Sequence, residues 1–292
     1  KIEETKVVKL LLERCNSEES GLNTKDEKGR NALMWTCKHG HKDVVKLLLD
    51  HPNIELNARN NIGHSERIEL RPSQDGLTAF LLACRNGHKD VVQLLLDHSD
   101  PNIDLNARTN HGTTAFIAAC GKGQKYVVQL LLNCPDKNIE LNARKDCNGF
   151  TAFIMACNNG HKDVVQLLLD HSDRIELNAR NTDGMTAFML ACYDGHKDVV
   201  QLLLDHSDPN IELNVKDEED GMTALMWACH NGHKDVVKLL LDHSERIELN
   251  ARDDDEETAF MIACSKGQND VVQLLLEHLD QNIELNVKDE ED

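Results

Sequence analysis

Two short apolar stretches separated by a glycine recur along this chain. In the copy at 183–206 the first stretch is Ala187–Cys192, the glycine is Gly195 and the second stretch is Val199–Leu204. The apolar residues of the second stretch form a broad face at the spacing of an α-helix. The pattern therefore predicts two short helices in each copy, joined to the next copy by a polar, extended connection such as 207–220.

Three residues mark the ends of these expected helices. Thr186 can accept a hydrogen bond from the free backbone amides at the start of the first helix. Gly195 ends that helix, because glycine adopts the left-handed conformation without strain. Asp198 suits the positive end of the second helix. Turn residues and apolar pattern thus predict the same helical hairpin.

The whole unit repeats. The segment His88–Asp100 returns letter for letter at His161–Asp173 and His196–Asp208, and Val-Val pairs begin at positions 7, 44, 91, 127, 164, 199, 236 and 271. Helices this short do not stay folded alone, so stacking of neighbouring units must stabilise them, as in a solenoid. We expect one array over 1–292, with a partial leading repeat at 1–20, about seven helix pairs from 31 to 278 and the start of a further connection at 279–292.

One interval is longer than the others, and its extra residues lie near His64–Ser73. There the segment His64–Leu70 repeats His243–Leu249 letter for letter, which indicates a duplicated piece of connection. We interpret it as a tolerated surface loop, and a partner-specific loop is the alternative.

The arrangement resembles the ankyrin repeat family. In the copy at 183–214 the matching residues are Gly184-x-Thr186-Ala-Phe, Ala191-Cys192-x-x-Gly195-His196, Val199-Val200-x-Leu202-Leu203 and Glu212-Leu213-Asn214. The resemblance implies an all-α, ankyrin-type solenoid of stacked antiparallel helix pairs joined by extended, β-hairpin-like fingers. Alanine replaces the proline that usually follows the threonine, an apolar residue replaces the family's histidine two positions later, and the connections are longer than in the family. Neither change affects the expected fold class.

The same resemblance implies a non-catalytic scaffold that recognises a protein through a concave groove and the finger tips. Positions that line the groove in the family vary from copy to copy here. An apolar row of Leu77, Phe150, Met185 and Met222 has residue types typical of binding hot spots; alternatively these side chains only cover the foot of each finger. The expected partner-binding residues are Leu77, Arg85, Asn86, Thr113, Lys122, Phe150, Asn158, Met185, Tyr193, Asp194, Met222 and His230.

Trp35 and Trp227 share one slot of the repeat. The other copies hold apolar residues there, namely Leu82, Ala118, Met155, Leu190 and Ile262. We therefore predict that both tryptophans pack in the core, in preference to serving as exposed anchors.

The net charge is −19 and the pI is near 5.2. This charge argues against nucleic acid and anionic membranes as partners, because both require a basic surface, and it is compatible with a basic protein partner. We interpret the acidic runs in the later fingers as a solvated edge, with steering of a basic partner as the alternative. The acidic edge comprises Asp217, Glu218, Glu219, Asp220, Asp253, Asp254 and Asp255, and Asp289–Asp292 continue it.

Seven of the ten cysteines occupy one apolar slot of the repeat, which predicts small buried core residues in a reduced, intracellular protein without disulfides. They are Cys37, Cys84, Cys120, Cys157, Cys192, Cys229 and Cys264; the remaining Cys15, Cys134 and Cys147 lie at helix ends or in loops. Seven equivalent thiols do not make the single activated nucleophile of an enzyme.

Histidine follows the helix-ending glycine in most copies, but Gln124 and Gln268 replace it in two. A metal ligand would not accept this exchange, whereas a hydrogen-bonding role at the start of the helix would. No His-x-x-x-His or Cys-x-x-Cys pair occurs in the sequence, so a zinc site is not expected. We expect no catalysis, no metal and no cofactor.

A structural spacer, or a duplicated or engineered repeat block cut from a larger protein and without a partner of its own, is the competing hypothesis, because the copies are nearly identical. The last unit, Thr258–His278, keeps the apolar pattern and has no polar cap. We expect a monomer that self-associates at this face if nothing covers it. No run of 18 apolar residues occurs, so no membrane span is expected.

Overall fold

The computed structural model of the 292-residue chain describes residues 21–61, 76–98, 103–206 and 211–278. These residues form fourteen α-helices and three 3-10 helices, and no strand is present among them apart from one isolated bridge between Arg252 and Thr258. The partial repeat at 1–20 with Cys15, the insertion near 64–73 and the acidic residues 289–292 lie outside the described residues.

The helices belong to two compact units, one within 1–147 and one within 148–292. The first unit contains η1 (Gly21–Asn23), α2 (Ala32–His39), α3 (Lys42–Leu49), α4 (Ala79–Arg85), α5 (Lys89–Asp97), α6 (Ala115–Gly121), α7 (Lys125–Leu132) and η3 (Pro135–Lys137). The second contains α8 (Ala152–Asn158), α9 (Lys162–Leu169), η4 (Ser172–Arg174), α10 (Ala187–Tyr193), α11 (Lys197–Asp205), α12 (Ala224–His230), α13 (Lys234–Leu241), α14 (Ala259–Ser265) and α15 (Asn269–Glu277). The prediction of one continuous array over 1–292 stays a prediction.

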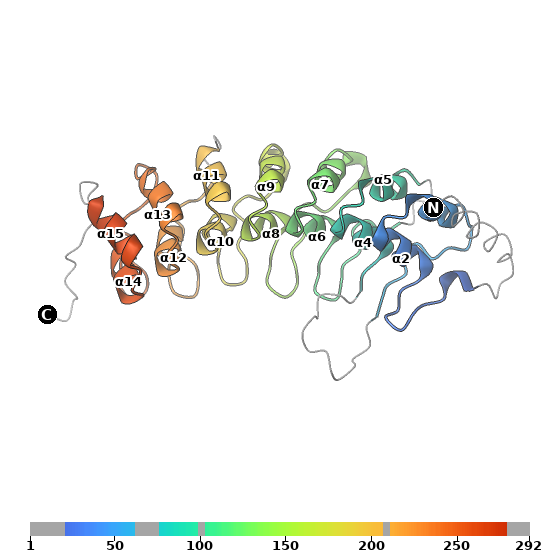
Figure 1. Ribbon diagram of the computed structural model, residues 1–292, viewed down its shortest axis with the longest axis horizontal. Coiled ribbons are helices and arrows are strands. Elements are labelled where there is room, and N and C mark those ends of the chain that lie inside the picture. Colours follow the sequence, from blue (N-terminus) through green and yellow to red (C-terminus); the bar gives the residue numbers. More distant parts are fainter. Residues whose placement is uncertain (1–20, 62–75, 99–102, 207–210, 279–292) are drawn as a thin grey trace. The chain divides into compact units, whose positions relative to one another are not determined.

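Each unit is a row of helix pairs (Figure 1). Within a pair, the first helix contacts the second, and between pairs of one unit first helices pack on first helices and second on second. In the second unit the row of first helices is α8, α10, α12 and α14, and the row of second helices is α9, α11, α13 and α15. The predicted all-α stack of helix pairs is confirmed.

A side-chain oxygen begins every first helix. Thr186 Oγ1 accepts a hydrogen bond from the backbone N–H of Met189 at 3.3 Å, as its position in the sequence predicts. The helix ends before Gly195, which has a φ of 72°. Equivalent caps are provided by Asn31, Thr78, Thr114, Thr151, Thr223 and Thr258. Because a helix of seven or eight residues leaves most of its terminal amides unpaired, these caps are a large part of its local stability.

The core consists of small and branched side chains between the two rows of helices. Six of the seven equivalent cysteines are buried and free, as expected: Cys37, Cys84, Cys120, Cys157, Cys192 and Cys229. The prediction is wrong for Cys264, which is exposed. Its helix, α14, is the last first helix of the described chain, and no described helix packs on its far side.

The fingers close on themselves and are tied to one another. In the finger before α10, the Asn181 side-chain oxygen accepts from the backbone N–H of Met185 at 2.7 Å, and the Asn181 N–H donates to the Met185 carbonyl at 3.0 Å. At the tips, the N–H of Glu218 donates to the carbonyl of Asp183, and that of Asp254 to the carbonyl of Asp220, both at 3.1 Å. The fingers of the second unit therefore stand side by side at fixed spacing.

Candidate functional site

The histidine and glutamine that follow the helix-ending glycine bind the preceding repeat. The Nε2 of His233 lies 2.8 Å from the carbonyl oxygen of Tyr193, and the side-chain amide of Gln268 donates to the carbonyl of His230 at 2.8 Å. The same bond joins His88 to Lys38, Gln124 to Arg85 and His196 to Asn158. Glutamine replaces histidine in this slot because both side chains offer an N–H at the required reach. The slot therefore has a hydrogen-bonding role, but the side chain binds the preceding repeat and makes no capping bond to its own helix, so the prediction of a role at the helix start is wrong.

The glycine of each repeat makes room for that ring. A Cβ placed on Gly195 would lie 2.6 Å from Nδ1 of His233, well inside contact distance. Only glycine therefore satisfies both the left-handed backbone and the close approach of the next repeat.

The finger asparagines also connect neighbouring repeats. Asn214 Oδ1 accepts from the backbone N–H of Glu248 at 2.9 Å, and its Nδ2 donates to the carbonyl of Arg246 at 2.8 Å. Asn178 Oδ1 accepts from the N–H of Glu212 at 3.1 Å in the same way. These finger asparagines are thus engaged between neighbouring repeats.

The varying residues gather at the C-terminal ends of the first helices and on the adjoining finger residues. We call this surface the first-helix face of each unit. It carries a tryptophan in each unit. The structure corrects the prediction that both tryptophans pack in the core, since Trp35 is 37% exposed and Trp227 is half-buried.

Trp35 is the centre of a cationic cluster in the first unit. The guanidinium of Arg30 lies 3.9 Å from the centre of its ring, and the ring of His39 stacks on it at 5.3 Å. The Nζ of Lys38 lies 5.2 Å from the same ring. The indole N–H donates to Asp26 at 3.0 Å, and Arg30 also pairs with Asp26 at 2.9 Å. The tryptophan is therefore held by a hydrogen bond and by ring contacts, and it remains 37% exposed.

Hydrogen bonds to the Asp26 carboxylate decide its ionisation. Partial burial acts to raise its pKa, but bonds from Arg30, Trp35 and the backbone N–H of Lys28 outweigh this and lower the pKa to about 2. Asp26 is therefore ionised at neutral pH, and its carboxylate binds Arg30 and Trp35.

Trp227 is the centre of an aromatic cluster in the second unit. Its ring meets Tyr193 edge-on at 5.1 Å and His230 at 5.5 Å, and its indole N–H donates to Asp217 at 2.7 Å. Tyr193 is 39% exposed. Burial raises the pKa of the neighbouring Asp194 carboxyl. The electrostatic effects of His196 and His233 act in the opposite direction and offset part of this shift. In this cluster Tyr193 is exposed, and the half-buried Trp227 is held in place by its hydrogen bond to Asp217.

Not all the predicted partner-binding residues are accessible. Leu77, Met185 and Met222 are buried at the foot of their fingers, so the expected exposed apolar row is wrong at these three positions. The finger hydrogen bonds pull them inward: the backbone N–H of Leu77 donates to Asn60 Oδ1 at 2.6 Å, as that of Met185 does to Asn181. They shape the floor of the face, and little of their surface is exposed.

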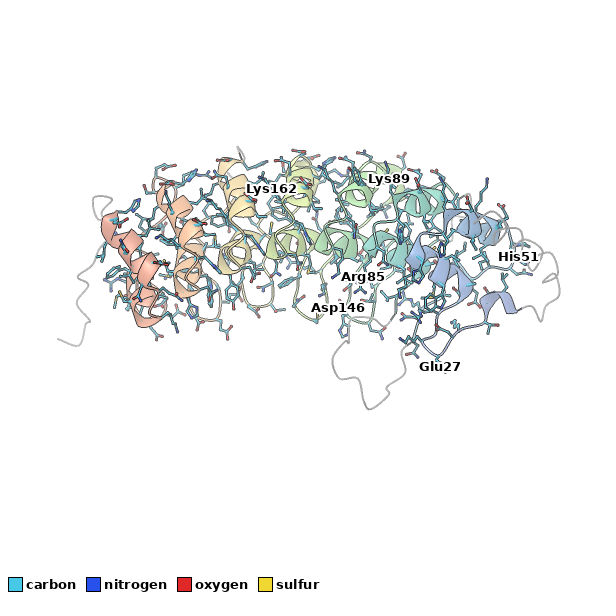
Figure 2. The ribbon with its side chains drawn as sticks, in the orientation of Figure 1. Glu27, His51, Arg85, Lys89, Asp146 and Lys162 are labelled. Carbon is cyan, nitrogen blue, oxygen red and sulfur yellow. The ribbon has the colours of Figure 1, made fainter. Side chains whose placement is uncertain are left out.

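The other predicted residues lie on the first-helix face of one unit or the other. Arg85, Asn86 and Lys122 line one hollow in the first unit, while Thr113 is half-buried there. In the second unit Phe150, Asn158 and His230 are half-buried, and Tyr193 and Asp194 are exposed. Figure 2 shows Arg85 between the finger residues Glu27 and Asp146 and the second-helix residue Lys89.

The acidic edge divides into buried and exposed carboxylates. Asp217 and Asp253 are buried, because each begins a finger turn, accepting from the backbone amides of Asp220 and of Glu257 respectively. These two are not free to steer a partner. The exposed members of the edge are Glu218, Glu219, Asp220, Asp254 and Asp255.

Over the described ranges, no group of three or more histidine, cysteine, aspartate or glutamate side chains could hold a metal ion. No helix among these residues is both long and apolar enough to span a membrane.

A family model described as ankyrin repeats (3 copies) matches residues 2–60, 59–145, 137–217 and 208–289, which is almost the whole chain. The chain belongs to the ankyrin repeat family. Ankyrin repeats are in general protein-interaction modules, and ankyrin repeat proteins are typically non-catalytic.

Similar curated proteins include osteoclast-stimulating factor 1 from three vertebrates. The Danio rerio protein is 46% identical over 48 residues, the Xenopus laevis protein 50% over 48 and the Rattus norvegicus protein 44% over 48. Each match covers 16% of this chain and 22% of the relative. The likeness is therefore to a short stretch of repeats.

Proposed function

We propose that this chain is a non-catalytic scaffold that binds another protein through the first-helix face. One observation carries the proposal. Many side chains that recur from repeat to repeat are buried or hydrogen-bonded to a neighbouring repeat, and the exposed ones at the ends of the first helices differ. Such a division is expected where a fixed frame presents variable contacts.

The tryptophan clusters are the proposed anchors of this binding. Tryptophan, tyrosine and arginine dominate the binding energy of interfaces, and Trp35, Tyr193 and Trp227 are held by hydrogen bonds or ring contacts before a partner arrives. Little side-chain entropy is then lost on docking, which favours affinity.

We further propose that both units act as one array that works inside the cell. We expect this array to be monomeric, apart from self-association at Thr258–His278 if nothing covers that face. The buried free thiols of the core support a reducing compartment. The exposed carboxylates of the fingers before α12 and α14 support a basic segment in the partner, because opposite charges steer encounter.

Repeat-to-repeat substitution gives the test. Leucine occupies the tryptophan slot at Leu82 and Leu190, so Trp35→Leu and Trp227→Leu keep a residue that the fold accepts. Affinity capture with tagged chain, read by mass spectrometry, should lose its partner in the double variant.

Tyr126→Asp is the matched control. Tyr126 is 70% exposed on the second-helix side, where the other described repeats have aspartate, such as Asp163. This variant should capture the same partner as the parent chain. If the control loses the partner and the tryptophan variant keeps it, binding lies on the other face.

The near-identity of the copies favours a second candidate, a structural spacer or duplicated block. A spacer predicts that neither the parent chain nor any variant enriches a partner over beads alone.

A further inference from the structure

The first unit contains a basic hollow on its first-helix face. It has a volume of about 410 Å³, and its lining includes Lys28, Arg30, Lys38, Arg85 and Lys122. No carboxylate of the described chain is part of this lining. Five cations without an anion are unexpected in a protein whose net charge is −19.

Most of this charge is not neutralised by neighbours. Arg30 pairs with Asp26 at 2.9 Å, but within the described ranges the other four cations form no ion pair. The effect reaches His39, whose pKa is lowered by burial and further by surrounding positive groups that include Lys38 and Arg30. The described lining of the hollow is therefore cationic.

The cations form a row along three successive repeats. Lys38 lies in the last turn of α2, Arg85 is the last residue of α4, and Lys122 directly follows α6. Packed helices lie about 8–10 Å apart, so the row extends over roughly 20 Å. An extended peptide in the polyproline II conformation advances about 3.1 Å per residue, so about six residues would follow the row. This conformation has three residues per turn, so carboxylates three residues apart point the same way and would meet successive cations.

We propose that this hollow binds an extended acidic segment of the partner protein, with aspartate or glutamate at every third residue. The inference rests on the proposed function and names the chemistry that one part of the face recognises. Arg85 is suited to it because a guanidinium binds a carboxylate through two parallel hydrogen bonds. Leu77 and Leu82 provide an apolar floor for the peptide backbone. A nucleic acid fits less well, because the remainder of the chain would repel a continuous polyanion.

The experiment is a fluorescence-anisotropy titration of the full chain, at low ionic strength, with three labelled peptides. One has glutamate at every third position and serine between, the second has the same composition with consecutive glutamates, and the third has lysine in place of glutamate. The first should bind saturably and the second more weakly, whereas any binding of the third to the acidic fingers should be independent of the cations of the hollow.

Charge reversals with matched controls locate the site. Arg85→Glu should weaken binding about tenfold, and Lys38→Glu with Arg85→Glu about a hundredfold. The controls are Lys89→Glu and the pair Lys42→Glu with Lys89→Glu, which change the net charge equally at the first residues of second helices. Figure 2 shows Lys89 on the second-helix row, away from Arg85. Both controls should stay within about twofold of the parent.

Four outcomes would overturn the proposal. The first two are absence of saturable peptide binding and an equal loss of peptide affinity in the control variants. The others are equal competition for the peptide by single-stranded oligonucleotide or inorganic phosphate, and self-association, detected by light scattering, in which the acidic fingers of a second copy occupy the hollow. The titration uses no natural partner. A failure here with tryptophan-dependent capture intact would therefore overturn the hollow alone and leave the scaffold function standing.

Discussion

The indole N–H of Trp227 donates a hydrogen bond to Oδ2 of Asp217 at 2.7 Å, across the finger that leads into α12. Oδ1 of the same carboxylate accepts from the backbone amides of Glu219 and Asp220 at 3.2 and 2.9 Å. One buried carboxylate therefore shapes the finger and orients the tryptophan. Asp26 has the same relationship to Trp35 in the first unit.

Replacing Asp217 by alanine removes all three of these bonds. We expect Asp217→Ala to lower the free energy of unfolding by about 2–3 kcal/mol, because buried donors lose a charged acceptor. In a Trp35→Leu background the fluorescence of Trp227 should also shift to the red as its ring becomes mobile. Urea unfolding measures the free energy, and the emission spectrum of the folded chain measures the shift of Trp227 fluorescence.

Glu219→Gln is the control for this prediction, since it removes one negative charge from the same finger at an exposed side chain. It should change stability by less than about 0.5 kcal/mol. Equal effects of the two substitutions would mean that net charge, and not the hydrogen bonds of Asp217, stabilises the finger.

The position that follows the helix-ending glycine should tolerate glutamine in place of histidine but not alanine. His233→Gln keeps an N–H directed at the Tyr193 carbonyl, as Gln268 does in the next repeat, so stability should hardly change. His233→Ala loses this bond and should cost about 0.5–1.5 kcal/mol in urea unfolding. A glutamine variant as unstable as the alanine variant would disprove the hydrogen-bonding role.

The cysteines should differ widely in their reaction with a thiol reagent. Cys147 is exposed and should be modified first, before the half-buried Cys134. Burial raises the pKa of the Cys37 thiol to about 12 and that of the equivalent Cys84 well above its usual range. These buried thiols should react only on unfolding, as timed labelling and peptide mass mapping would show. Early modification of Cys84 would indicate that the repeat opens locally.

Acid should weaken the first finger through Asp26. Its pKa is about 2 in the folded chain against an ordinary 3.8, so the carboxylate stabilises the fold above the ordinary value and this contribution is lost as pH falls toward 2. The difference in unfolding free energy between parent and Asp26→Asn should therefore be constant near neutrality and shrink below about pH 4. A carbon-detected NMR titration that gives Asp26 an ordinary pKa would contradict this.

Much of the fold follows from local sequence. Thr186 and Gly195 stand where a cap and a left-handed residue are needed, and the seven copies repeat the signal. The exchange of histidine for glutamine predicted a hydrogen-bonding role, and the slot makes hydrogen bonds. What the pattern did not contain was the partner of the slot, a carbonyl of the preceding repeat that only the stacked structure brings within reach.

The binding face was harder to predict, because one slot can point inward in one repeat and outward in another. Leu82 and Leu190 are buried in the slot where Trp35 is exposed, since an indole is too large for a space that accepts leucine. The wide range of side-chain size in that slot was the signal available in the sequence. Met185 and Met222 were expected on the binding surface but are buried. For Met185, a finger hydrogen bond from its backbone N–H to Asn181 holds it below the surface.

Hydroxyl-radical footprinting of the chain with and without its captured partner tests the central claim most directly. If repeat-invariant residues stabilise the stack and varying ones bind, then Trp35, Tyr193 and Trp227 lose oxidation in the complex, and the more exposed Tyr126 does not. Protection of Tyr126 with unchanged oxidation of both tryptophans would contradict the account.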